Sequence, residues 1–161
     1  MKIKLTQNKV TLIDDADYEL IKQYKWCAGR THQCWYAITQ ARNDDGKRTT
    51  LYMHRLIIGN NCKDLFIDHI NGDGLDNRRS NLRICTNAEN LHNRLPRREM
   101  YKGVYWCKRK KPWRARIRNN GRLIHLGYYD SKEKAANAYN KAARNYFGGF
   151  AFLNQIGIDL C

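Results

Sequence analysis

The stretch from residue 68 to residue 90 reads DHINGDGLDNRRSNLRICTNAEN and joins a carboxylate, an imidazole and several amides within 23 residues. Its glycines and asparagines predict a loop, and the apolar segment 65–70 leads into that loop as a strand. After the loop, Thr86 and Glu89 have the spacing of a capping box, which predicts a short helix. The loop is too polar to be core, so we expect a strand, a functional loop and a helix in that order.

The chain around this stretch is strongly basic. Its 161 residues contain 30 Lys and Arg against 15 Asp and Glu, which gives a formal net charge of +15 and a pI near 9.8. Between residues 94 and 122 there are twelve basic residues and a single acid, Glu99. A surface with so few acids repels itself unless it meets a polyanion. We therefore expect a polyanionic partner.

The cysteines and the N-terminus exclude several classes of protein. The six cysteines include no CxxC pair, so we expect neither a structural zinc nor a disulfide framework. The chain begins MKIKLTQNK, which lacks the apolar core of a signal peptide, and no run of about 18 apolar residues follows. These features predict an intracellular, cytoplasmic protein without a membrane partner.

The first 50 residues have no sharp motif. Short runs of alternating apolar and polar residues (KIKLT, KVTLI, CWYAIT) predict antiparallel strands, interrupted at Asp14-Asp15 and at the turn 43–46. The same pattern predicts a further strand over Leu51–Ile58. Two interpretations of residues 1–50 stay open. This segment belongs to the module of the polar loop, or it forms a further arm that contacts the polyanion, such as DNA.

The last third of the chain predicts three strands and a helix. The strands cover 101–107, 112–118 and 122–128, and an Asn-Asn-Gly turn at 119–121 joins the last two. Ser131 then caps a helix with a narrow apolar face, which ends at Gly148-Gly149. The helix is expected to lie across the sheet.

The faces of this predicted sheet differ in charge. On the middle strand, Trp113, Ala115 and Ile117 alternate with arginines, so the apolar side chains are expected to face the helix and the arginines the opposite side. Core packing is expected for both Trp106 and Trp113. The outward arginines, which can read guanine in a major groove, are Arg114, Arg116 and Arg118.

The polar loop has the groups needed to hydrolyse a phosphodiester. That reaction needs a base that deprotonates water and a cation that neutralises the charge growing on the phosphate. A histidine can be the base. Asp68 and Asn90 offer the oxygen ligands that suit magnesium or manganese.

Asp68-His69, Asn81 and Asn90 resemble the ββα-metal motif of His-Asn-His (HNH) nucleases. The stretch 68–86 matches the pattern DHxNGxxxDNRxxNLRxxT of phage and intron-encoded homing endonucleases. The resemblance implies that His69 is the general base, Asp68 and Asn90 are ligands of one metal ion, and Asn81 braces the loop and orients His69. The third motif letter is Asn90 here, and His92 or Asn93 is the alternative ligand.

The stretch 101–154 is similar to the Apetala (ethylene-response-factor) DNA-binding domain, through YKGVY, WRARIR, HLGYY and EKAANAY. The resemblance implies a three-stranded sheet in the major groove and one packing helix. Arg116 stands where that family usually has an acid, and His125 where it usually has tryptophan. The positions expected to contact DNA are Lys102, Gly103, Tyr105, Arg114, Arg116, Arg118 and His125.

Several residues in or near the polar loop have a structural interpretation beside a functional one. Asn71-Gly72 and Asp76-Asn77 are typical turn formers. His54 precedes the loop on a predicted strand and is left out of catalysis as a structural residue. Contacts to phosphate are favoured over a solvated surface for Arg78, Arg79 and Arg83.

Together these patterns predict an α+β fold, in which a ββα-metal nuclease module with short N-terminal antiparallel strands precedes a three-stranded antiparallel sheet packed on one helix. The expected function is a site-specific, metal-dependent DNA endonuclease of the homing type in the host cell of a phage or mobile element. A restriction-type dimeric endonuclease and a non-catalytic DNA-binding regulator are the alternatives. Double-stranded DNA is the expected partner, with a monomer favoured over a homodimer. The expected segments are 1–50, the nuclease core 51–94, a linker 95–100, the DNA-binding domain 101–154 and a tail 155–161.

Overall fold

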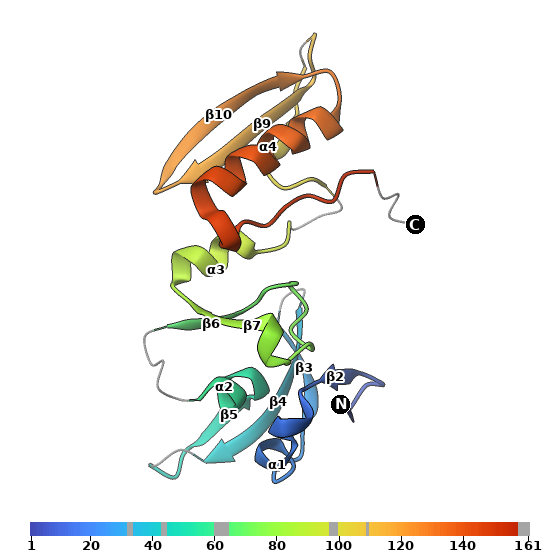
Figure 1. The fold of residues 1–161 in the computed structure, drawn as a ribbon, viewed down its shortest axis with the longest axis vertical. Coiled ribbons are helices and arrows are strands. Elements are labelled where there is room, and N and C mark those ends of the chain that lie inside the picture. The colour runs from blue at the N-terminus through green and yellow to red at the C-terminus, as the bar shows by residue number, and fades with distance from the viewer. Residues whose placement is uncertain (32–33, 43–44, 60–64, 97–99, 109, 158–161) are drawn as a thin grey trace. The chain divides into compact units, whose positions relative to one another are not determined.

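The computed structural model describes residues 1–31, 34–42, 45–59, 65–96, 100–108 and 110–157. The chain divides into two compact units, Met1–Asn90 and Leu91–Cys161. Each unit contains one or more small antiparallel sheets together with helices, so the fold contains both α and β elements (Figure 1). Within the described part of the chain, no helix is long and apolar enough to span a membrane.

The first unit contains three small antiparallel sheets, with strand orders β1-β2, β3-β4-β5 and β6-β7. Its strands are β1 (Lys2–Lys4), β2 (Val10–Leu12), β3 (Cys27–Thr31), β4 (Cys34–Arg42), β5 (Arg48–Tyr52), β6 (Phe66–His69) and β7 (Leu82–Cys85). Its helical segments are η1 (Asp15–Asp17), α1 (Tyr18–Ile21), α2 (Met53–Ile58), η2 (Arg79–Asn81) and the start of α3 (Asn87–Asn93).

One hydrophobic core joins the N-terminal segment to the strands that flank the polar loop. Ile13 and Ile21 from the N-terminal segment pack in one cluster with Met53, and with Ile67 of β6 and Leu82 of β7. The first 50 residues therefore share their core with β6 and β7.

The prediction of a strand over Leu51–Ile58 was wrong beyond Tyr52. The chain forms β5 up to that residue and then the helix α2. Met53, His54 and Ile57 are all buried, and their spacing places them on one side of a helical turn. Six residues are too few for the apolar pattern to separate a strand from a buried helix.

The second unit confirms the predicted three-stranded antiparallel sheet packed on one helix. The strand order is β10-β9-β8, and Figure 1 shows α4 lying along one face of the sheet. Val104 and Ala115 pack against Ala135 and Ala136 of the helix, because alternate side chains of the strands point toward it. The elements are β8 (Val104–Trp106), β9 (Trp113–Asn119), β10 (Arg122–Tyr129), α4 (Lys132–Phe147) and η3 (Gly148–Phe150).

The predicted turn and caps in this unit are confirmed. Asn120 and Gly121 have φ of 47° and 77°, the left-handed pair that a tight hairpin needs. The Ser131 hydroxyl accepts a hydrogen bond from the Lys134 N–H at the start of α4. Of the two tryptophans, Trp113 packs against the core, but Trp106 is 56% exposed and the core prediction was wrong for it. Trp106 lies at the end of the short edge strand β8.

Candidate functional site

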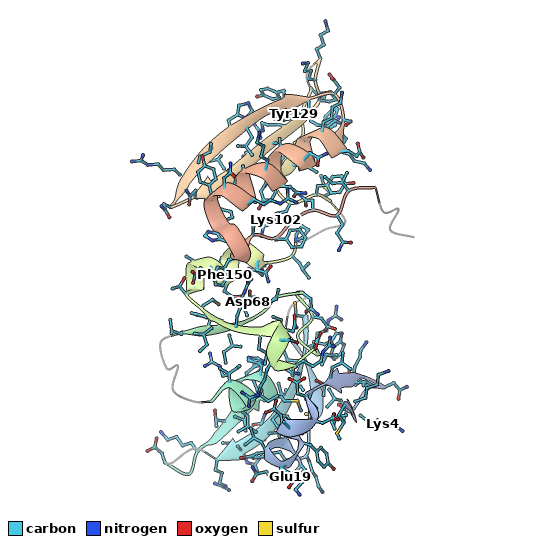
Figure 2. All side chains as sticks on the ribbon, in the orientation of Figure 1. Lys4, Glu19, Asp68, Lys102, Tyr129 and Phe150 are labelled. Carbon is cyan, nitrogen blue, oxygen red and sulfur yellow. The ribbon has the colours of Figure 1, made fainter. Side chains whose placement is uncertain are left out.

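Asp68 and His69 lie buried at the end of β6, where the strand enters the polar loop (Figure 2 labels Asp68). In the β6–β7 ladder, Asp68 is opposite Arg83 and His69 is opposite Leu82. The Asp68 Oδ2 atom accepts hydrogen bonds from Arg83 Nε at 2.9 Å and Nη2 at 2.6 Å. One carboxylate oxygen thus receives both donors.

The His69 ring is surrounded by groups from three other segments. Its Nε2 atom lies 3.3 Å from the Oδ1 atom of Asn77. His54 from α2 meets the ring edge to face at 5.0 Å between centroids, and Tyr36 from β4 lies at 5.9 Å. None of these three residues was expected at the site from the sequence. The only signal for His54 was a single histidine inside the apolar run MHRLII.

Burial keeps this cluster of rings uncharged at neutral pH. It lowers the pKa of His69 below its ordinary value, against the opposing effects of the Asn77 hydrogen bond and the Asp68 charge. Burial and the neighbouring His69 lower the pKa of His54 to about 3. Burial also raises the pKa of Tyr36 to about 12, with Cys34 adding to the shift. A neutral His69 imidazole can accept a proton, as a general base must.

Asn81 holds the two ends of the polar loop together. Its Oδ1 atom accepts the Asn71 backbone N–H at 3.0 Å, and its Nδ2 atom donates to Asn71 Oδ1 at 3.0 Å and to the Asp76 carbonyl at 2.8 Å. The Ile70 N–H donates to the Asn81 carbonyl. Asn81 thus braces the loop, and the side chain that lies against the His69 Nε2 atom is that of Asn77.

The three arginines beside the loop are all held in ion pairs. Arg78 donates from Nε and Nη2 to Asp76 at 2.8 and 2.7 Å. Arg79 forms a similar pair with Asp17 of η1 through Nε and Nη2. With Arg83 on Asp68, each guanidinium fastens the loop or its flanking strand. Contacts from these arginines to phosphate stay a prediction.

The N-terminal segment lies directly against the loop. Leu12 of β2 donates its N–H to the Leu75 carbonyl and accepts the Asn77 N–H, both at 2.8 Å. On the other side of the loop, a Cβ atom added to Gly74 would lie 2.4 Å from the Trp35 carbonyl oxygen. Residues from β2 and β4 therefore fix the shape of the loop.

Asp68 and Asn90, the two expected metal ligands, carry hard oxygen donors. Asn90 lies in α3, whose start is fixed by the predicted capping box: the Thr86 N–H donates to Glu89 Oε2 at 2.8 Å, and the Glu89 N–H to Thr86 Oγ1 at 3.3 Å. Carboxylate and amide oxygens are ligand types that Mg²⁺ and Mn²⁺ accept, and these ions keep several water ligands. Among the described residues, no cluster of three or more His, Cys, Asp or Glu could hold a metal ion.

In the second unit, the face of the sheet opposite α4 is basic and aromatic. Arg114 is opposite Tyr105 on β8, and Arg116 is opposite His125 on β10. The Arg116 guanidinium lies 4.0 Å from the centroid of the Tyr105 ring. Arg118 is exposed, and in the described part of the chain the buried Nε atoms of Arg114 and Arg116 have no hydrogen-bond partner.

Two of the residues expected to contact DNA are turned inward. The Lys102 ammonium donates to the carbonyls of His92 and Arg94 at 2.7 and 2.6 Å (Figure 2), and burial, with the Arg94 charge, lowers its pKa to about 8. A Cβ atom on Gly103, whose φ is +76°, would lie 2.1 Å from the Tyr139 ring. The His92 ring, in the same unit, stacks on Phe147 at 3.7 Å between centroids. These contacts give all three residues a packing role.

Comparison with known proteins agrees with both halves of this description. A family model described as HNH endonuclease matches residues 52–92, and one described as AP2 domain matches residues 99–149. An uncharacterised HNH endonuclease of Acanthamoeba polyphaga mimivirus is 30% identical over 141 residues, which cover 86% of this chain and 71% of that protein. No solved structure matches significantly. The chain therefore belongs to the HNH endonucleases, DNA-cleaving enzymes, and carries its nuclease domain before an AP2 DNA-binding domain.

Proposed function

We propose that this endonuclease cleaves double-stranded DNA at a specific site by a one-metal mechanism of the homing type, with His69 as the general base. The observation that carries the proposal is the buried, uncharged His69 imidazole next to the Asp68 carboxylate at the end of β6. The chain order of two strands and a helix, β6, β7 and α3, supports the proposed ββα-metal module. Asp68 and Asn90 are the proposed ligands of a single Mg²⁺ or Mn²⁺ ion.

The proposed chemistry divides between the metal and the chain. A divalent cation, when bound, stabilises the charge that grows on the phosphate and on the leaving 3′ oxygen. His69 takes a proton from the attacking water, and its burial keeps it in the neutral form that can do so. Asn81 and the ion pairs of Arg78 and Arg79 keep the loop in place. Attack by that water would leave a 5′ phosphate and a 3′ hydroxyl.

The second unit is proposed to recognise the DNA target sequence. The sheet face formed by Tyr105, the arginines of β9 and His125 would enter the major groove, where arginine side chains recognise guanine through two hydrogen bonds. The Tyr105 ring supports this proposal because it lies against the Arg116 guanidinium, 4.0 Å from ring centroid to Cζ, and so restricts where that side chain can point. The proposed boundaries are a nuclease core over 51–94 and a DNA-binding domain over 101–154, with residues 1–50 as part of the nuclease module. The proposed form is a monomer that nicks one strand, because cutting one strand needs only one active site.

The proposal is tested with wild type, His69→Ala and Asp68→Asn on supercoiled plasmid that carries the source genome region, with Mg²⁺ or with EDTA. General-base catalysis contributes about 10²- to 10⁴-fold, so His69→Ala is expected to reduce cleavage by that factor. Its affinity for the same DNA should not change in a gel-shift assay. Arg116→Ala is the matched control, because it should weaken DNA binding while cleavage at saturating protein persists. Undiminished cleavage by His69→Ala would overturn the assignment of the base.

A further inference from the structure

A buried chain of hydrogen bonds connects His69 to the N-terminal segment. His69 Nε2 lies 3.3 Å from Asn77 Oδ1, and Asn77 Nδ2 donates to Thr11 Oγ1 at 2.7 Å. The Thr11 hydroxyl in turn donates to the Leu75 carbonyl at 2.7 Å. Thr11 and Asn77 are both 0% exposed, so water does not compete for the hydrogen bond between them.

The donors and acceptors in this chain can be aligned in only one direction. The Leu75 carbonyl at 2.7 Å can only accept, and it is a stronger and nearer acceptor than Met53 Sδ at 3.9 Å, so the single hydroxyl proton of Thr11 points to it. The Thr11 oxygen must then accept, which requires the NH₂ group of Asn77 to face it. The oxygen of that amide consequently faces His69, and an oxygen acceptor at this place requires a proton on His69 Nε2.

We propose that Thr11 and Asn77 are positioning residues that hold His69 as the Nε2–H tautomer, so that its Nδ1 atom carries the lone pair that accepts the proton of the attacking water. The inference rests on the proposed role of His69 as the base and deepens it. A base oriented by a third, hydrogen-bonded group is a common arrangement at nucleolytic sites. Here the group that fixes the orientation is Thr11 of β2, 58 positions before His69 and outside the matched HNH segment.

The tautomer can be measured directly and without cleavage. Long-range ¹H–¹⁵N spectra of the full chain, with ¹⁵N-labelled histidine, distinguish a protonated Nε2 from a protonated Nδ1. The chain has five histidines, and the spectrum of His69→Gln identifies the signals of His69. We expect the Nε2–H form in the wild type. A wild-type His69 that carries its proton on Nδ1 would overturn the proposal before any other substitution is made.

Substitutions at Thr11 then test the link to the reaction. Thr11→Val removes the hydroxyl at nearly constant volume, and Thr11→Ser keeps it. Thr39→Val is the matched control, because Thr39 is a buried threonine of β4 outside the hydrogen-bond chain. Thr11→Val should give mixed tautomers and lower kcat by about 10- to 100-fold with KM unchanged. This is the usual loss of activity when a group that orients a functional side chain through hydrogen bonds is removed. Thr11→Ser and Thr39→Val should keep the wild-type tautomer and kcat within about twofold, well below that range.

The outcomes separate this inference from the proposed function. If Thr11→Val, folded by its amide spectrum, keeps the wild-type tautomer and kcat, the positioning role is overturned while His69 can still be the base. If Thr11→Val does not fold, Asn77→Ala is measured in its place with the same expectation. Undiminished cleavage by His69→Ala would instead overturn the proposed role of His69 and the catalytic meaning of the hydrogen-bond chain together.

Discussion

Arginines are used in opposite ways in the two units. Around the polar loop of the first unit, Arg78, Arg79 and Arg83 each meet a carboxylate in an ion pair. On the sheet face of the second unit, the described residues provide no such carboxylate for the arginines of β9. Arginine donors without acceptors in the protein are suited to phosphate and base acceptors. The arginines of β9 are therefore the stronger candidates for DNA contact, while Arg78, Arg79 and Arg83 would have to exchange a carboxylate of the protein for a phosphate.

The largest expected effect that tests this comparison is on the pair between Arg83 and Asp68. Their side chains are only 17% and 7% exposed. Arg83→Ala would leave the buried Asp68 carboxylate without its two donors, and removing one partner of a buried pair costs about 3–5 kcal/mol. We expect the free energy of unfolding to fall by that amount, measured by urea denaturation. A loss below about 1 kcal/mol, typical of a surface pair, would show that Arg83 is not a structural brace.

Arg116 provides the contrasting experiment in the second unit. Arg116→Ala should leave folding stability nearly unchanged but weaken specific DNA binding by about 1–3 kcal/mol, the usual contribution of one arginine that recognises a base. Fluorescence anisotropy at several salt concentrations measures this loss and separates base contacts from phosphate contacts. Arg83→Lys is the control, because it keeps a positive charge beside Asp68 and lies in β7 of the first unit, not on the sheet face of the second. Equal losses of affinity in both variants would remove the contrast between the units.

Local patterns in the sequence were sufficient for much of the fold. The capping box of Thr86 and Glu89, the Asn120-Gly121 turn and the alternation on β9 depend on residues only a few positions apart, and all three are present in the structure. The helix α2 was not predicted, because a short apolar run fits a strand equally well.

The neighbours of His69 could not be predicted from such patterns. The hydrogen bond between Asn77 and Thr11 spans 66 positions, and Tyr36 and His54 reach the ring from separate elements. Asn77 also follows the rules for a turn residue, which conceals its buried contact. The motif identified the residues proposed for catalysis and metal binding. The residues that orient them are brought together by tertiary packing, which the local sequence does not encode.

The buried His54 should make the first unit sensitive to acid. Its pKa is about 3 in the folded chain and about 6.5 when unfolded, so the unfolded state binds the proton first as the pH falls. The stability is complete above about pH 6.5 and should fall by about 1 kcal/mol between pH 7 and pH 5.5. Its neighbours Tyr36, Tyr52, His69 and Arg55 offer no carboxylate that could compensate. In urea denaturation at both pH values, His54→Gln should lose less stability than wild type, and an equal loss would contradict the prediction.

The smallest expected effect is at Arg79, which separates an exposed brace from a buried one. Arg79 forms a two-donor pair with Asp17, as Arg83 does with Asp68, but its side chain is 53% exposed. Asp17 is only 4% exposed, but water reaches the Arg79 guanidinium and can replace its donors, so Arg79→Ala should reduce the free energy of unfolding by about 0.5–1 kcal/mol, less than Arg83→Ala. The same variant should keep its affinity for DNA, and Arg79→Lys serves as the matched control. If Arg79→Ala weakened DNA binding and Arg79→Lys restored it, Arg79 would be a phosphate contact, and an ion pair in the free protein would no longer distinguish the arginines of the two units.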